Sequence, residues 1–115
     1  SSVLEHDIAE SYETFSGPML EQFFRQKLMR TGKYTAVGSW WKQERGAQGN
    51  QNEVDIIAVG RDRKSAFVAE VKRQKKSFRE GVFLDKVENL KKGVLAGYKI
   101  QTACLTLDDL RSPIP

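Results

Sequence analysis

The chain has 115 residues and a mass of 13.1 kDa, which is enough to bury one hydrophobic core and too little for two. Hydrophobic residues make up 39% and charged residues 30%, a composition that excludes a disordered chain and a membrane-embedded one. The single cysteine, Cys104, excludes an internal disulfide framework. We expect it to be a buried apolar residue in a reducing compartment, the cytoplasm.

The charge is unevenly distributed along the chain. Nineteen Lys and Arg residues against fifteen Asp and Glu residues give a net charge of +4, which only permits a polyanionic partner. Residues 1–16 contain four acidic residues and no Lys or Arg, whereas residues 61–92 contain eleven basic and five acidic residues. The positive charge is therefore concentrated in one third of the chain. Because the first residue is Ser, we also expect the chain to be part of a larger protein.

Two helices are predicted at the start of the chain. Apolar residues at helical spacing predict an amphipathic helix over residues 3–15 with an acidic outer face. A second helix is predicted to begin after Ser16, a suitable N-cap, with Pro18 in its first turn. It is predicted to end at Thr31-Gly32. Its apolar stripe consists of Leu20, Phe23, Phe24 and Leu28.

Strands follow the second helix. Aromatic and β-branched residues predict a strand over residues 34–42, and residues 44–52 consist of turn-forming residues. Two further strands are predicted over residues 53–60 and 65–72. Both are apolar on both faces, as the central strands of a sheet are.

The last elements complete an α/β fold. Helical spacing through Phe78, Val82, Phe83, Val87 and Leu90 predicts a helix over residues 77–92, closed by Gly93. A fourth strand is predicted over residues 98–107, followed by a tail over residues 108–115. Because a helical crossover precedes it, this strand should run parallel to the third strand or to a neighbour. The prediction is a single domain with a four-stranded mixed sheet flanked by helices.

Acidic residues interrupt the two central strands. A tight turn over residues 61–64 places Asp55 opposite Glu70. The same register places Glu53 opposite Lys72, and alternation directs all four side chains to one side of the sheet. Opposed carboxylates in apolar strands repel each other and lose hydration. Such a pair is kept where a cation lies between the acids, or where one acid needs a raised pKa for chemistry. Oxygen ligands favour Mg²⁺ or Mn²⁺ over zinc.

Two simpler interpretations stay open at this point. Ion pairs of Lys72 with Glu53 and of Glu70 with Arg73 would make an ordinary charged sheet end. A register slip of one residue would instead place the acids on opposite faces. Glu21 favours a site, because it lies about 20° beyond Leu28 at the border of the buried stripe of its helix. There it would be a third carboxylate near the pair, although a glutamate at such a border is usually only solvated.

These residues resemble the PD-(D/E)xK nuclease superfamily, which includes restriction endonucleases and archaeal Holliday junction resolvases. The matching residues are Glu21 on a helix, Asp55 in the second strand and Glu70-Val71-Lys72 in the third. The stretches Gly17-Pro-Met-Leu-Glu21, Asn52-Glu-Val-Asp-Ile-Ile57 and Ala69-Glu-Val-Lys72 are similar to the nuclease-like C-terminal domain of certain prokaryotic AAA+-type ATPases. The resemblance covers residues 17–106. Val54 stands where the proline of the superfamily's name would be.

The resemblance implies a restriction-endonuclease-like fold and a Mg²⁺ or Mn²⁺ cofactor. Asp55, Glu70 and the backbone carbonyl of Val71 would be the metal ligands. Lys72 would hold or help deprotonate the attacking water, and Glu21 would orient a water or bind a second ion. Metal and lysine together supply what phosphodiester hydrolysis needs, an activated water and neutralised charge at phosphorus. The candidates for phosphate-backbone contacts are the basic residues Arg73, Lys75, Lys76 and Arg79.

Three hypotheses about function follow. The first is a Mg²⁺-dependent DNA endonuclease domain, and the second is a nuclease-fold module that no longer cuts and acts as a regulatory or docking part of an ATPase. Retention of all four residues favours the first, because a redundant site should lose at least one. The third is a DNA-binding domain that uses only the basic run. A homodimer is compatible with the resemblance, since related nucleases are often dimers.

Overall fold

The computed structural model describes residues 16–40 and 53–113. The predicted helix over residues 3–15 and the turn-forming residues 44–52 lie outside them. Within them the chain forms, in order, the elements α2 (Gly17–Arg30), β1 (Tyr34–Trp40), β2 (Val54–Gly60), β3 (Ser65–Val71), the 3-10 turn η2 (Lys75–Ser77), α3 (Glu80–Lys92), β4 (Lys99–Leu105) and the 3-10 turn η3 (Leu107–Asp109).

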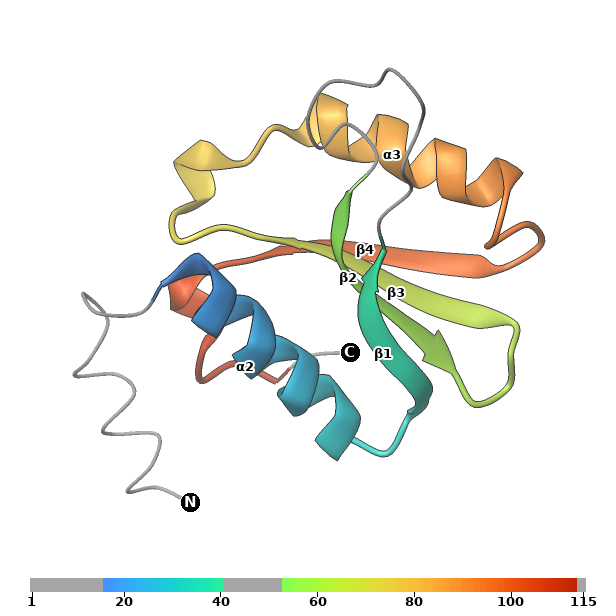
Figure 1. The fold of residues 1–115 in the computed structure, drawn as a ribbon, viewed down its shortest axis with the longest axis horizontal. Coiled ribbons are helices and arrows are strands. Elements are labelled where there is room, and N and C mark those ends of the chain that lie inside the picture. The colour runs from blue at the N-terminus through green and yellow to red at the C-terminus, as the bar shows by residue number, and fades with distance from the viewer. Residues whose placement is uncertain (1–15, 41–52, 114–115) are drawn as a thin grey trace.

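The sheet is mixed, as predicted. Its strand order is β1-β2-β3-β4, with antiparallel pairing up to β3 and parallel pairing of β3 with β4 through the crossover helix α3. The two helices cover opposite faces of this sheet (Figure 1). Among the described residues, no helix combines the length and apolar character that crossing a membrane requires.

The β2–β3 hairpin has the predicted register, which runs from Ile56 opposite Ala69 to Val59 opposite Ala66. Asp62 fixes the turn, because its Oδ1 accepts hydrogen bonds from the Lys64 and Ser65 amides at 2.9 and 3.0 Å. Asp and Asn side chains commonly stabilise tight turns by such local hydrogen bonds to the backbone. Asp55 and Glu70 therefore stand one residue beyond the last paired positions.

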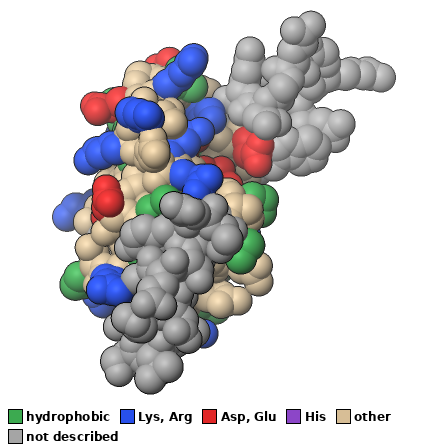
Figure 2. All heavy atoms as spheres, turned by 90° about the vertical axis from the view of Figure 1, so that its left-hand side faces the viewer, with side chains coloured by type: hydrophobic (Ala, Val, Ile, Leu, Met, Phe, Trp, Pro, Cys, Tyr) green, Lys and Arg blue, Asp and Glu red, His purple; other side chains and the backbone are tan. Residues whose placement is uncertain are grey.

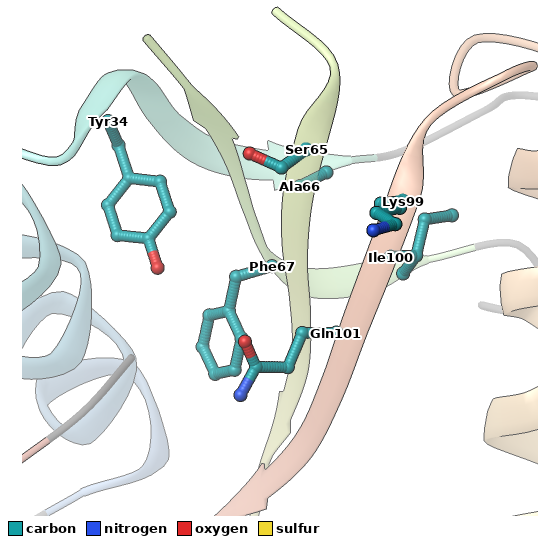
Figure 3. A pocket seen from close by; sticks show the side chains of 7 residues that line it. All are labelled: Tyr34, Ser65, Ala66, Phe67, Lys99, Ile100 and Gln101. Atoms are coloured by element: carbon teal, nitrogen blue, oxygen red, sulfur yellow. The ribbon is translucent and has the colours of Figure 1, made fainter. Parts of the chain in front are cut away.

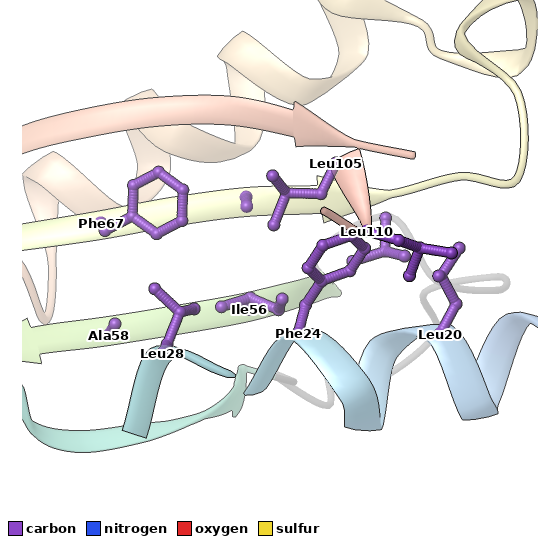
Figure 4. Close-up of a cluster of buried hydrophobic side chains, with 10 residues drawn as sticks. Leu20, Phe24, Leu28, Ile56, Ala58, Phe67, Leu105 and Leu110 are labelled. Atoms are coloured by element: carbon purple, nitrogen blue, oxygen red, sulfur yellow. The ribbon is translucent and has the colours of Figure 1, made fainter. Parts of the chain in front are cut away.

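The helix α2 begins and ends as its sequence indicates. The Ser16 side chain accepts a hydrogen bond from the Met19 amide at 3.2 Å, and Gly32 has a φ of 75° just after the C-cap Thr31. A residue with positive φ at this position is typically glycine. The side chains of Leu20, Phe24 and Leu28 are completely buried. They pack against one face of the sheet and against Leu105 and Leu110 (Figure 4).

The helix α3 begins later than predicted. Residues 75–77 form a 3-10 turn and Phe78 and Arg79 are extended, so the α-helix starts at Glu80 rather than at residue 77. Phe83, Val87 and Leu90 pack on the second face of the sheet, with Phe78 partly buried against them. Val82, which the spacing placed with them, is 50% exposed, because it precedes Phe83 by one residue and so lies about 100° around the helix from the buried stripe.

Burial of the two central strands differs. β3 is buried on both faces, as predicted, whereas β2 alternates between buried and half-buried residues. We attribute the difference to the crossover, because α3 connects β3 to β4 and gives less cover to β2. β2 is a central strand as predicted, but the expected burial on both faces is complete on only one of them.

Part of the predicted tail belongs to the core. Leu107–Asp109 form η3, where Thr106 and Asp109 make a capping box, and Leu110 is 3% exposed. The Lys27 ammonium donates hydrogen bonds to the carbonyls of Leu110 and Ser112 at 3.0 and 2.6 Å. Residues 107–112 are therefore held against α2, and the prediction of a tail from residue 108 is wrong for them.

Candidate metal and nuclease site

The predicted site residues come from three elements at one end of the sheet. Asp55 is the second residue of β2, Glu70 is the penultimate residue of β3, and Lys72 directly follows β3. Glu21 lies in the N-terminal half of α2. The structure joins Glu21 to Asp55 directly, whereas Glu70 has a partner that the sequence did not indicate.

Glu21 and Asp55 form a pair of like charge. The pKa of Glu21 is raised from 4.5 to about 7, first by burial, then by the hydrogen bond to Asp55 and the negative charge of Asp55, with a smaller contribution from the charge of Glu53. The Arg25 guanidinium opposes this shift, with Nη1 at 3.8 Å from Glu21 Oε2. Glu21 therefore keeps its proton until near neutral pH, and the protonated carboxyl can donate the hydrogen bond to Asp55.

The Asp55 carboxylate is also fixed by the backbone. Its Oδ2 accepts a hydrogen bond from the Val71 amide at 2.8 Å. Arg25 Nη1 reaches the Asp55 carbonyl at 3.4 Å. The Val71 amide thus holds one carboxylate oxygen of Asp55 at the end of β3, and Arg25 holds its backbone next to α2.

Glu70 forms an ion pair with α3, on the other face of the sheet. Its Oε1 lies 3.3 Å from the Lys86 ammonium, and the side chains of Glu70 and Lys86 are only 9% and 12% exposed. Glu70 thus has an ion-pair partner, as the simpler interpretation expected, although the partner shown is Lys86 and not the expected Arg73. Lys72 is half-buried and, among the described residues, its ammonium makes no ion pair with Glu53 or with any other acid.

The donor set suits a hard cation only in part. Within residues 16–40 and 53–113, no group of three or more His, Cys, Asp or Glu side chains is arranged to hold a metal ion. Two adjacent carboxyl groups, of which Glu21 keeps its proton until near neutral pH, are nevertheless a position where a dication can replace that proton, and oxygen donors fit Mg²⁺ or Mn²⁺. The carboxyl groups of Glu21 and Asp55 offer oxygen donors for such an ion. Glu70 offers a third oxygen donor, but its Oε1 is paired with the Lys86 ammonium.

The predicted DNA-binding residues lie beside this site. Arg73, Lys75, Lys76 and Arg79 are all exposed, and they lie on η2 and the segments that flank it, between β3 and α3. Figure 2 looks toward the side of the molecule at which β3 and β4 end, and it shows many Lys and Arg side chains with acidic side chains between them. This surface can contact a polyanion without being uniformly basic.

A hollow of about 350 Å³ lies away from these residues, where β3 and β4 begin, and its lining includes Tyr34, Phe67 and Gln101 (Figure 3). The Ser65 hydroxyl in its wall already donates to Asp62 Oδ1 at 2.9 Å. Burial raises the pKa of Tyr34, which keeps its phenol neutral. The hollow contains none of the predicted site residues, and its polar groups do not define a ligand.

Cys104 lies in β4 opposite Glu70 and is half-buried. Burial is the main cause that raises the pKa of its thiol, and the negative charge of Glu70 adds to the shift. A thiol with a raised pKa is a poor nucleophile. The cysteine is thus less buried than expected, and the raised pKa of its thiol gives no sign of a reactive role.

Sequence reasoning missed Lys86 and Arg25, the two cations that contact the acids. A signal existed for each. Lys86 stands three residues after Phe83 and four before Leu90, on the side of α3 that packs on the sheet. Arg25 follows Glu21 by four residues. Neither spacing identifies the acid that the cation meets, since that depends on how the helices dock.

The fold and the site define a small α/β domain with carboxylates and lysines at one end of a mixed sheet. The chain belongs to the DUF234 family, described as archaeal and bacterial proteins of unknown function, whose model matches residues 1–84. The match contains the predicted catalytic residues and ends two residues before Lys86. No curated protein matches the chain, and no solved structure matches it.

Proposed function

We propose that the chain is a Mg²⁺-dependent DNA endonuclease domain of the PD-(D/E)xK type, which hydrolyses phosphodiester bonds. The observation that carries the proposal is the hydrogen-bonded pair of carboxyl groups, Glu21 and Asp55, at the sheet end where Glu70 and Lys72 also lie. Two adjacent carboxylates cost stability unless a cation neutralises them. A fold that keeps them beside a half-buried lysine and an exposed basic segment is suited to a metal ion and a phosphate.

Each residue has a role in this proposal. Asp55 and Glu70, with the Val71 carbonyl, would hold the ion, which when bound lowers the pKa of a coordinated water and stabilises negative charge at phosphorus. Lys72 would orient the attacking water and stabilise the charge that develops on the phosphate. Glu21 would orient a second water or contribute to a second ion. The Val71 amide supports these roles by fixing one oxygen of Asp55.

The proposal extends to partners and location. DNA would contact the exposed residues Arg73, Lys75, Lys76 and Arg79 through its backbone phosphates. We further propose a cytoplasmic protein in which this domain accompanies an ATPase domain, with a homodimer as the assembly to test first.

A second candidate function is supported by a different observation. Glu70 is bound by Lys86 and is 7% exposed, and no three-carboxylate group is formed among the described residues. This arrangement favours a nuclease-fold module that does not cut and that serves as a regulatory or docking part of an ATPase.

Cleavage assays separate the candidates. The chain is incubated with supercoiled plasmid and with a branched DNA junction in Mg²⁺, beside Glu70→Ala, Lys72→Ala and the exposed-acid control Glu80→Ala. The endonuclease proposal expects nicked products, a loss of about 100-fold or more in both site variants, and no change in the control. Absence of cleavage, or cleavage that survives both site substitutions, would favour the silent module. DNA binding that depends on salt and is indifferent to Asp55→Ala, without cleavage, would indicate the third hypothesis.

A further inference from the structure

We infer that Lys86 competes with the metal ion for Glu70, so that a cation gains this carboxylate as a ligand only by displacing the Lys86 ammonium. The inference rests on the proposed function and adds a regulatory element to the same site. It makes the metal-free protein a latent form in which Glu70 is withheld.

The geometry of Lys86 carries this inference. Its ammonium lies 3.3 Å from Glu70 Oε1, within the range of a direct ion pair, and its side chain is 12% exposed. Lys86 comes from α3, whereas Glu21 and Arg25 come from α2 on the opposite face of the sheet. The charge of Glu70 is therefore balanced by a residue of α3, although the hairpin register sets Glu70 against Asp55.

The charges of these groups decide whether removing the charge of Lys86 strengthens or weakens metal binding. A dication at Glu70 would stand close to the Lys86 ammonium, and two positive charges at that distance repel each other strongly where solvent screening is weak. A neutral residue at position 86 removes this repulsion. It also leaves the buried Glu70 carboxylate without a counter-charge in the metal-free protein, a state that a bound cation relieves. Both effects strengthen metal binding in the variant.

The side chain is suited to such an exchange. Lysine carries its charge on a flexible four-carbon stem, so the ammonium can leave one carboxylate oxygen while the stem stays packed. A permanent structural pair would instead keep Glu70 fixed in every state. The two roles predict opposite results when the charge of Lys86 is removed.

The experiment measures Mn²⁺ binding to the full chain by titration calorimetry and by thermal shift, at one pH and ionic strength. The variants are Lys86→Gln, Lys86→Met and Lys91→Gln, with Asp55→Asn added to Lys86→Gln to show that any gain depends on the site. Lys91→Gln is the matched control, because Lys91 is on the same helix and pairs at 3.3 Å with the exposed Glu88. Methionine is the second variant, because it keeps the volume of the lysine stem if glutamine prevents folding.

The expected result is a Kd for Mn²⁺ about tenfold lower in either Lys86 variant than in the wild type, with a larger Mn²⁺-induced rise in Tm. The control should bind as the wild type does, and the added Asp55→Asn should abolish the gain. Wild-type binding with equal or weaker binding in both Lys86 variants overturns the inference and leaves the proposed function in place. Failure of every protein to bind Mn²⁺ overturns the proposed function, and the inference with it.

Discussion

Two acids at the same end of the sheet are neutralised in different ways. Asp55 lies beside another acid, Glu21, whose pKa is raised to about 7, so a cation would stabilise this pair. Glu70 lies one residue beyond the paired part of the same hairpin and has a buried lysine as its partner. The helix α2 places an acid, Glu21, beside Asp55, so that a cation would stabilise them. The helix α3 instead provides a cation, Lys86, that pairs with Glu70. We call Asp55 with Glu21 the open position, because both of its side chains are acids, and Glu70 the closed position, because Lys86 neutralises it.

Breaking the closed position should have the largest effect on stability. Lys86→Met leaves a nearly buried carboxylate unpaired, and we expect a loss of about 3 kcal/mol in the free energy of unfolding. Urea denaturation in EDTA measures it. The matched control Lys91→Met breaks a pair whose side chains are 48% and 59% exposed, and it should cost less than about 1 kcal/mol. Equal losses in the two variants would show that Glu70 and Lys86 are not a buried pair.

Relaxing the open position should have a smaller effect of opposite sign. The folded protein keeps the proton of Glu21 up to about pH 7, whereas the unfolded chain loses it near pH 4.5. Stability should therefore fall as pH rises through this window, and the penalty is complete above pH 7. Glu21→Gln removes the penalty and should gain about 1 kcal/mol at pH 8, a value reduced because the side chain is 30% exposed.

Urea denaturation at pH 5 and pH 8 checks this difference between the two pH values. The control is Glu80→Gln, at an exposed position in the first turn of α3, which should leave the wild-type pH dependence in place. A Glu21→Gln protein that keeps the wild-type slope would contradict the account of the acid pair.

The basic segment should show the smallest effect on any single quantity. Replacing Lys75 and Lys76 together by Ala should weaken binding to duplex DNA several-fold and lower the salt slope of log Kd by about two. Fluorescence anisotropy at several salt concentrations measures it. Lys91 and Lys92, at the other end of α3, form the matched pair of lysines. If their double Ala variant weakens binding equally, the contacts reflect net charge and not the segment beside the site.

The parts of the fold that depend on local chemistry could be predicted from the sequence. The Asp62 turn defined the hairpin register, and the stripe of Leu20, Phe24 and Leu28 defined the buried face of α2. The start of α3 was missed, because Phe78 fits the helical spacing of the apolar residues although it is extended and follows a 3-10 turn. Leu110 was missed, because its burial depends on docking against α2.

The candidate site also has features that the local sequence predicts and features that depend on tertiary packing. The turn predicted the register that sets Asp55 against Glu70, and the place of Glu21 follows from the border of the stripe. The contacts do not bear out the prediction that Asp55 and Glu70 project from one side of the sheet, because Glu70 pairs with Lys86 of α3 whereas Asp55 contacts Glu21 of α2 on the other face. The Glu70–Lys86 contact depends on the rotation of α3 over the sheet, which no local pattern in the sequence defines. The charge balance of the site is therefore a tertiary property, although its residues could be found in the sequence.

The central claim is that the acid pair of Glu21 and Asp55 is a position for a divalent cation. The most direct test compares the thermal unfolding of the chain and of Asp55→Ala, with and without Mn²⁺ at pH 7. The account predicts that Mn²⁺ raises the Tm of the wild type and leaves that of Asp55→Ala unchanged, because a ligand stabilises only the protein that binds it. A wild-type Tm that does not respond to Mn²⁺, or an equal rise in both proteins, would contradict it.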